Sequence, residues 1–173
     1  MDIRYAIVDV ETTGFSPRED RVVEVACVVV DARFRELASF SSLVDPGRPI
    51  PAYATAVHGI RDRDVAGAPS LAALRPRLRE LTAGATVVAH NAVFDRRFLT
   101  CLEDREWLCT LHLARRAFPH APAYKNQALR TYLGIDDPRL RGRTAHRAYA
   151  DVIVTAGVLR ACFTELQGTS RSA

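Results

Sequence analysis

Long apolar runs, paired cysteines and lysine are all scarce in this sequence. No stretch approaches the roughly 18 consecutive apolar residues that a membrane-spanning helix needs, so no membrane association is expected. Asp2 and Arg4 precede a short apolar run that is broken at Asp9, which is not the pattern of a signal peptide. The sequence therefore predicts a cytoplasmic protein.

The cysteine spacing argues against two kinds of site, and the single lysine shows which residue supplies the positive charge. Four cysteines occur without any CxxC pair, so neither a disulfide framework nor a zinc site is expected. Lys125 is the only lysine, and arginine therefore supplies nearly all of the basic charge behind the formal net charge of +4. A mildly basic chain is compatible with a polyanionic partner but does not identify one.

The length and the alternation of patterns predict one α/β domain. A chain of 173 residues can bury a sizeable core, and no repeat or second domain is evident, so we expect a core over about 4–166 and a frayed tail over 167–173. β-branched runs joined by short links predict antiparallel strands at 4–11, 22–31 and 34–44.

The rest of the chain is expected to alternate between helices and strands, which predicts a mixed five-stranded sheet flanked by helices. One expected helix is capped by Ser70 and reaches Leu81, with a second start or a kink at Pro76. The other expected helices are 52–60, 92–102, 110–117, 126–133 and 146–166. The expected strands are 85–89 and 107–110.

The first candidate site lies where the first strand ends. Asp9 and Glu11 are two residues apart, so in a strand they point to the same face, just before a Thr-Thr-Gly turn. Two neighbouring carboxylates repel each other, and a divalent cation between them removes that repulsion. Oxygen-only ligands suit Mg²⁺ or Mn²⁺. The alternative is a pair of solvated acids at the tip of a strand.

Asp95 lies in the first turn of a helix that follows a buried strand. An acid in a first turn also complements the helix dipole, so its position alone has a structural explanation. The same position faces the end of the sheet where open α/β folds bind ligands.

Asp151 lies in an apolar stretch of the last helix, where an aspartate is unfavourable and needs a reason to be present. A salt bridge to Arg147, one turn earlier, is one explanation. His146 precedes Asp151 by five residues, so the two share a face only if His146 lies at or before the start of the helix.

Each segment is a weak signal alone, but their order is specific. A strand ending in D-x-E-T-T-G is followed by a strand-to-helix N-x₃-D and then by H-x₄-D. This order resembles the DEDDh 3′–5′ exonuclease family, the DnaQ-like proofreading exonucleases of the ribonuclease H-like superfamily. The resemblance covers residues 4–165 and includes His58-Gly59-Ile60 and His90-Asn91-Ala92. A companion class has tyrosine four residues before the last acid; Arg147 occupies that position here, which favours the histidine class.

The resemblance implies a ribonuclease H-like fold and a metal-dependent 3′–5′ exonuclease. It implies that two Mg²⁺ or Mn²⁺ ions are bound by Asp9, Glu11, Asp95 and Asp151. His146 would be the general base that deprotonates the attacking water, and histidine changes its charge near neutral pH. Activity should be lost in EDTA and should rise with pH as His146 loses its proton. The expected substrate is single-stranded DNA, cut from the 3′ end to nucleoside monophosphates.

The same resemblance implies how a strand end is held. The residues implied are Thr12, Thr13 and Gly14 through their backbones, Phe15 by stacking on the terminal base, and His90, Asn91 and Phe94 along the site. Ordinary core packing is the alternative for Phe15. Candidate phosphate contacts, each equally explained as a solvated charge, are Arg96, Arg97, Lys125, Arg141 and Arg143.

The sequence leaves several alternatives open. An exonuclease of the same family that prefers RNA, or a catalytically silent nucleic-acid-binding module, would share most of these features. Polymerase-associated members resembling the epsilon subunit of DNA polymerase III often carry a C-terminal polymerase-binding tail. The sequence ends within about seven residues of its last expected helix, so we expect a stand-alone exonuclease rather than a dedicated proofreading subunit. An apolar stripe on that helix could also make a homodimer.

Overall fold

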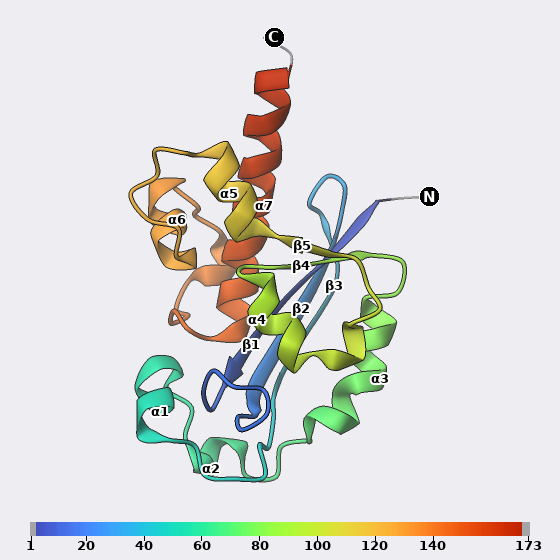
Figure 1. The fold of residues 1–173 in the computed structure, drawn as a ribbon, viewed down its shortest axis with the longest axis vertical. Helices are drawn as coiled ribbons and strands as arrows, with labels where there is room; N and C mark the ends of the chain where they lie inside the picture. Colours follow the sequence, from blue (N-terminus) through green and yellow to red (C-terminus); the bar gives the residue numbers. More distant parts are fainter. Residues whose placement is uncertain (1–2, 171–173) are drawn as a thin grey trace.

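A mixed five-stranded sheet forms the centre of the molecule (Figure 1). The computed structural model describes residues 3–170. β1 (Arg4–Thr12), β2 (Val22–Asp31) and β3 (Glu36–Leu43) are antiparallel neighbours. β4 (Thr86–Ala89) pairs parallel to β1, and β5 (Trp107–Cys109) pairs parallel to β4, which gives the order β3-β2-β1-β4-β5. The predicted mixed sheet, with its first three strands antiparallel, is confirmed.

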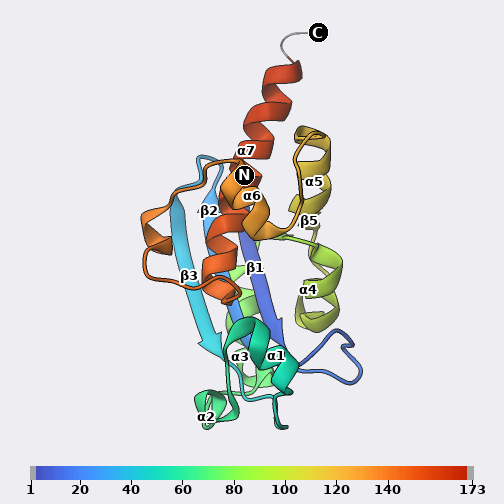
Figure 2. The same cartoon turned by 90° about the vertical axis from the view of Figure 1, so that its left-hand side faces the viewer.

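One face of the sheet is covered by α5 (Thr110–Ala117), α6 (Asn126–Tyr132) and α7 (Ala148–Ser170) (Figure 2). Because side chains alternate along a strand, Ile7 packs into this layer. Asp9 and Glu11 follow Ile7 at intervals of two and therefore point toward the same layer. The alternation of β1 thus directs both acids toward α7.

The other face is covered by α3 (Leu71–Leu81), α4 (Ala92–Phe98) and η1 (Thr100–Leu102), with Ala6, Val8 and Val10 of β1 packed beneath them. β2 is buried on both sides, which explains its nearly unbroken apolar sequence from Val22 to Val30. Glu24 is the one charged residue in that run.

Two short helices lie near the carboxyl end of β1. α1 (Ala52–His58) ends at Gly59, whose φ of 76° is the left-handed conformation expected there. α2 (Asp62–Val65) was not expected from the sequence. The Asp64 side chain accepts a hydrogen bond from the backbone N–H of Arg61 at 2.8 Å, which closes this single turn. A second unexpected turn, η2 (Pro138–Leu140), interrupts the loop before α7.

Several boundaries differ from the sequence-based expectations. α3 runs through Pro76 as one helix, and its predicted Ser70 cap is confirmed by the hydrogen bond from the Ala73 backbone N–H. α4 ends at Phe98 because Leu99 leaves helical geometry, and η1 follows.

The last helix also differs from the expectation at both ends. α7 starts at Ala148 rather than at residue 146, because His146 has a left-handed φ of 57°. The expected tail at 167–170 is helical, and residues 171–173 lie outside the described part of the chain. No helix within residues 3–170 is long and apolar enough to cross a membrane.

Candidate active site

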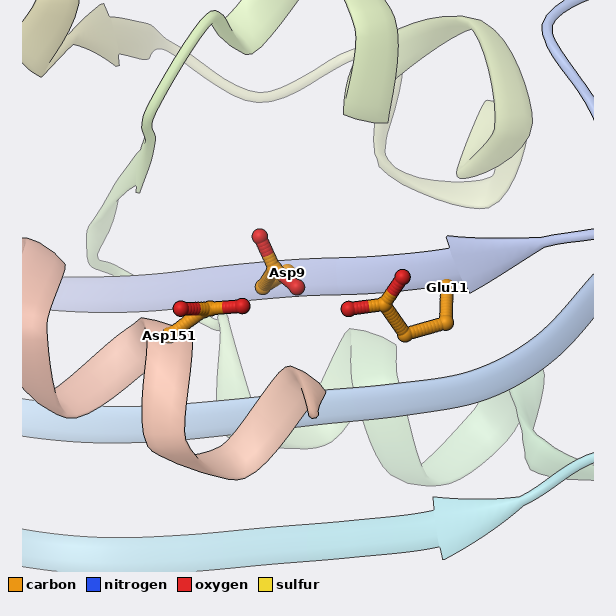
Figure 3. A group of neighbouring side chains, drawn as sticks. All are labelled: Asp9, Glu11 and Asp151. Carbon is orange, nitrogen blue, oxygen red and sulfur yellow. The ribbon is translucent and has the colours of Figure 1, made fainter. Parts of the chain in front are cut away.

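Three carboxylates meet between the carboxyl end of β1 and the start of α7. Figure 3 shows Asp9 and Glu11 on β1 and Asp151 on α7 with their carboxylates turned toward one another. One ligand atom from each of the three lies within 4.8 Å of the others, which is close enough for a shared metal ion. The structure therefore brings Asp151 to two acids that lie 140 and 142 residues before it in the sequence.

Two amides on α6 hold Asp151 in this position. The Gln127 side-chain N–H donates to the Asp151 carboxylate at 2.6 Å, and the Asn126 side chain donates to the Asp151 backbone carbonyl at 3.1 Å. Sequence analysis did not single out either amide, because one amide pair in a short helix forms no recognisable pattern. A carboxylate held by a neighbouring amide is oriented before any ligand arrives.

Asp95 is buried on α4, near Asp9 but outside the group of three. Burial raises the pKa of Asp95 to about 8, and hydrogen bonds from the backbone N–H groups of Asp95 and Val10 oppose this shift. Its repulsion is the second largest cause, after burial, of the high pKa of Asp9. The fourth predicted acid therefore shares the electrostatics of the site.

This concentration of acids is costly in the absence of a cation. Burial and the neighbouring carboxylates raise the pKa of Asp9 well above its ordinary value, and the same two causes raise the pKa of Glu11 to about 8. Burial also raises the pKa of Asp151. A carboxylate-only donor set of this kind fits hard divalent cations such as Mg²⁺ or Mn²⁺. The residues present thus fit a divalent metal centre.

His146 lies two residues before α7 and is exposed. Its backbone N–H and its ring are both near enough to the Asp151 carboxylate to lower the pKa of that acid. The condition derived from helix geometry, that His146 must precede the helix to approach Asp151, is met. A histidine beside the acid cluster is placed to accept a proton from a water molecule there.

Comparison with known proteins places these residues in a family. Residues 6–159 match the RNase_T family, described as exonucleases. This chain belongs to the RNase_T exonuclease family. The match begins within β1 and ends within α7, so it includes every acid of the site.

Curated relatives share the sequence of this chain at similar levels. A DNA polymerase III subunit epsilon-like protein of Rhodobacter capsulatus is 39% identical over 89% of this chain and 23% of its own length. Exodeoxyribonuclease 10 of Escherichia coli is 37% identical over 88% of this chain and 66% of its own length. The chain therefore spans about a quarter of the first of these relatives and about two thirds of the second.

Solved exonuclease structures share the fold. Exonuclease X in complex with 5′ overhanging duplex DNA is 34% identical, with a TM-score of 0.79 over 92% of this chain and 91% of that one. Exonuclease I of E. coli in complex with a dT13 oligonucleotide has a TM-score of 0.81 at 19% identity, over 98% of this chain and 43% of that one, which is a likeness of fold alone. The ribonuclease H-like fold predicted from the sequence is confirmed.

The turn after β1 is built around Asp20. The Thr13 hydroxyl donates to the Asp20 carboxylate at 3.1 Å, and the Ser16 backbone N–H donates to the same group at 2.9 Å. A Cβ on Gly14 would come within 2.5 Å of the Asp20 oxygens, so this position needs glycine. The backbones of Thr12, Thr13 and Gly14 are thus held in one shape beside Glu11, although their predicted contact with a nucleotide stays a prediction.

Phe15 is 80% exposed, so core packing does not explain it. Its ring meets Phe94 edge-on at 6.4 Å between centroids, which gives the turn an aromatic rim. Asn91, also predicted to line the site, is exposed at the start of α4 with a left-handed φ of 67°. Substrate contact by these residues stays a prediction.

His90 has a different environment from the one expected of a substrate contact. One ring nitrogen is 2.7 Å from the Tyr124 carbonyl, and the other is 2.9 Å from the Thr110 hydroxyl. Burial lowers the pKa of His90 and so favours the neutral ring, an effect that the hydrogen bond to the Tyr124 carbonyl opposes. In the structure His90 therefore joins the end of β4 to α5 and to the segment before α6.

One ion pair with a buried carboxylate was not anticipated. Arg147 was considered as a partner of Asp151, but its guanidinium binds Glu24 of β2, with Nη2 and Oε1 2.7 Å apart. Helix spacing favoured the local partner, whereas tertiary packing brings together two residues that are 123 positions apart. The available signal was Glu24 itself, because a charged residue in a buried strand needs a partner.

The candidate phosphate-binding side chains are all exposed, and within residues 3–170 none forms an ion pair with a carboxylate. The Arg143 guanidinium lies over the Tyr149 ring at 4.4 Å. Their contact with a nucleic acid stays a prediction for Arg96, Arg97, Lys125, Arg141 and Arg143.

Proposed function

We propose that this chain is a metal-dependent 3′–5′ exonuclease that removes nucleoside monophosphates one at a time from single-stranded DNA. The observation that carries the proposal is the group of carboxylates from Asp9, Glu11 and Asp151, whose ligand atoms lie within 4.8 Å of one another. The exonuclease family and the names of the relatives, which include an exodeoxyribonuclease, support both the reaction and the choice of DNA.

In this proposal the chain's acids hold the metal ions. Asp9, Glu11 and Asp151 would bind one Mg²⁺ or Mn²⁺, and Asp95 would join Asp9 at a second. Bound divalent ions supply stabilisation of the negative charge that develops on the attacking and leaving oxygens of a phosphodiester. Gln127 keeps the Asp151 carboxylate oriented for this role.

The remaining residues would handle the proton and the strand end. His146 takes a proton from the attacking water, since its ring is exposed beside Asp151. The turn at 12–14 contacts the terminal nucleotide, and Phe15 stacks on its base, a contact that tolerates any sequence. Exposed arginines contact the phosphates further along the strand.

The test is digestion of 5′-labelled single-stranded DNA and RNA of matched sequence with Mg²⁺ or Mn²⁺. The wild type should produce a one-nucleotide ladder that EDTA abolishes, and Asp9→Asn should lose at least about 10³-fold of the rate, since a metal ligand supports several kcal/mol of transition-state stabilisation. Asp104→Asn is a matched control, because Asp104 is an exposed acid paired with Arg79 away from the site.

The outcomes separate the alternatives. A higher rate on RNA than on DNA would replace the repair-type substrate with an RNA-processing one. Tight nucleic-acid binding with no ladder on either substrate would show a silent binding module and overturn the proposal. Because only part of the relatives' length is shared, polymerase association and dimerisation need their own measurements.

A further inference from the structure

Glu24 is a buried acid that the proposed reaction does not use. It lies directly opposite Glu11 in the β1–β2 pairing, and its side chain is only 5% exposed. Within the described residues, Glu24 is not part of the group of possible metal ligands. Its oxygens are instead occupied by hydrogen bonds, so a reason other than metal binding must account for a charge in the middle of an apolar strand.

All of the partners of Glu24 lie immediately after His146. The Arg147 guanidinium donates through Nε to both carboxylate oxygens at 3.0 and 3.2 Å, and through Nη2 at 2.7 Å. The Ala148 backbone N–H, the first of α7, donates to Glu24 Oε2 at 2.8 Å. Glu24, on β2, therefore caps the first turn of α7 and fixes the direction in which the chain enters this helix.

On its other side His146 lies beside Asp151, since its backbone N–H and its ring both lower the pKa of that carboxylate. Residues 141–146 are all exposed, and within this segment Arg143 lies over the Tyr149 ring. A left-handed φ of 57° is unfavourable for histidine and persists only where the surrounding contacts determine it. The contacts that do so are those of Asp151 on one side and Glu24 on the other.

We propose that Glu24 and Arg147 are positioning residues that hold His146 over the acid cluster in the orientation needed for proton transfer. The inference rests on the proposed exonuclease function. In this proposal the ion pair places the base and does not bind metal. Loss of the pair should therefore lower kcat only while His146 is present.

The test is a double-mutant cycle that combines Glu24→Gln with His146→Ala. Glu24→Gln keeps the size of the side chain and removes the charge that holds Arg147. In the wild-type background we expect kcat to fall by roughly 10- to 100-fold, since a small displacement of a catalytic group has effects of this size. In the His146→Ala background the same substitution should change kcat by less than about twofold, because the interaction energy of coupled residues appears as non-additivity.

Two further measurements isolate the positioning role. The affinity for Mn²⁺, measured by calorimetry without nucleic acid, should stay within about threefold of wild type in Glu24→Gln, because the three clustered carboxylates remain. Hydrogen exchange at the amides of His146 and Ala148 should speed up in this variant. Both measurements apply even if the wild type proves to have no nuclease activity, which would be a failure of the proposed function instead.

The matched control is Glu36→Gln. Glu36 also forms an ion pair with an arginine before α7, Arg139. This contact precedes residues 141–146 in the chain, and in the variant Arg139 would keep its ion pair with Asp137. Its kcat should stay within about twofold of wild type. Should Glu24→Gln not fold, Arg147→Lys tests the same contact, because lysine keeps the charge but loses the forked geometry.

Equal losses of kcat from Glu24→Gln with and without His146 would overturn the inference, as would full activity of this variant. A large loss of Mn²⁺ affinity would also overturn it, because Glu24 would then act through the metal site.

Discussion

Asp9 and Glu11 lie on the central strand of the sheet, whereas His146 lies on an exposed segment between η2 and α7. β1 is hydrogen-bonded to β2 on one side and to β4 on the other, and Val10, between the two acids, is buried. The position of these two acids is therefore determined by the same contacts that hold the whole sheet together.

His146 depends on far fewer contacts. Those that hold it are two carboxylates, Asp151 and Glu24, which bind the backbone and side chain around it. The difference teaches that the acids of the site lie within the core, whereas the proposed general base is held at its surface by polar contacts. Substitutions should therefore separate metal binding from proton transfer.

The largest expected effect is on the rate. His146→Ala should lower kcat by roughly 10²- to 10⁴-fold, the usual contribution of a general base. Mn²⁺ affinity should stay near the wild-type value, whereas Asp9→Asn should lose both rate and affinity. Single-turnover kinetics and calorimetry on the same samples measure the two quantities. A loss of Mn²⁺ affinity in His146→Ala would show that metal binding and proton transfer cannot be separated in this way.

Gln127→Leu should have an intermediate effect, on the affinity of the acid cluster for metal. Without the amide, the Asp151 carboxylate loses its 2.6 Å hydrogen bond, and metal affinity should weaken by about tenfold. Gln167→Leu, at an exposed position of α7, is the control and should bind Mn²⁺ normally. Unchanged affinity in Gln127→Leu would mean that the helix alone orients Asp151.

Metal-free protein should lose stability as pH rises. The pKa values of Glu11 and Asp95 are raised to about 8 in the folded state, so folding favours their neutral forms. Their stabilising contribution is complete below their ordinary pKa values and is lost as pH rises through about 8. We expect the Tm in EDTA to be about 5 °C or more lower at pH 8.5 than at pH 6.

Two comparisons sharpen this expectation. Glu11→Gln removes one of the titrating groups and should flatten the dependence of Tm on pH. Mn²⁺ should raise the Tm more at pH 8.5 than at pH 6, because the ligands must be deprotonated to bind it. A metal-induced increase that is larger at pH 6 would contradict the assignment of these acids as ligands.

The smallest expected effect concerns the aromatic rim. Phe15→Ala should raise KM for single-stranded DNA by about fivefold to tenfold, as expected for the loss of one stacking contact. Because Phe15 is largely exposed, thermal stability should not change. Leu37→Ala, an equally simple truncation of an exposed apolar residue on the edge strand β3, should leave KM unaltered.

The sequence predicted the parts of the site that depend on local periodicity. The two-residue spacing of Asp9 and Glu11 determines their shared face in any strand, and the β-branched runs identify the strands themselves. The position of His146 followed from helix geometry as a condition. It is met because Glu24 caps Ala148, which makes the helix begin two residues later than expected.

The parts that the sequence did not predict depend on tertiary contacts. Arg147 had a partner available one turn away, and only the packing of α7 on β2 gives it Glu24 instead. His90 was predicted to line the site, which stays a prediction, and its hydrogen bonds to Thr110 and Tyr124 join it to segments 20 and 34 residues further along the chain. Local spacing carries no information about contacts of this kind.

The packing of α7 across β1 and β2 also determines when the protein can become active during its synthesis. Asp9, Glu11 and Asp95 leave the ribosome well before Asp151, which belongs to the last helix of the described chain. Until that helix has been made and has docked, the sheet lacks the third member of its carboxylate cluster and the anchor of His146. Under the proposed function, the nascent chain therefore stays inactive toward the nucleic acids around it until most of its own fold is complete.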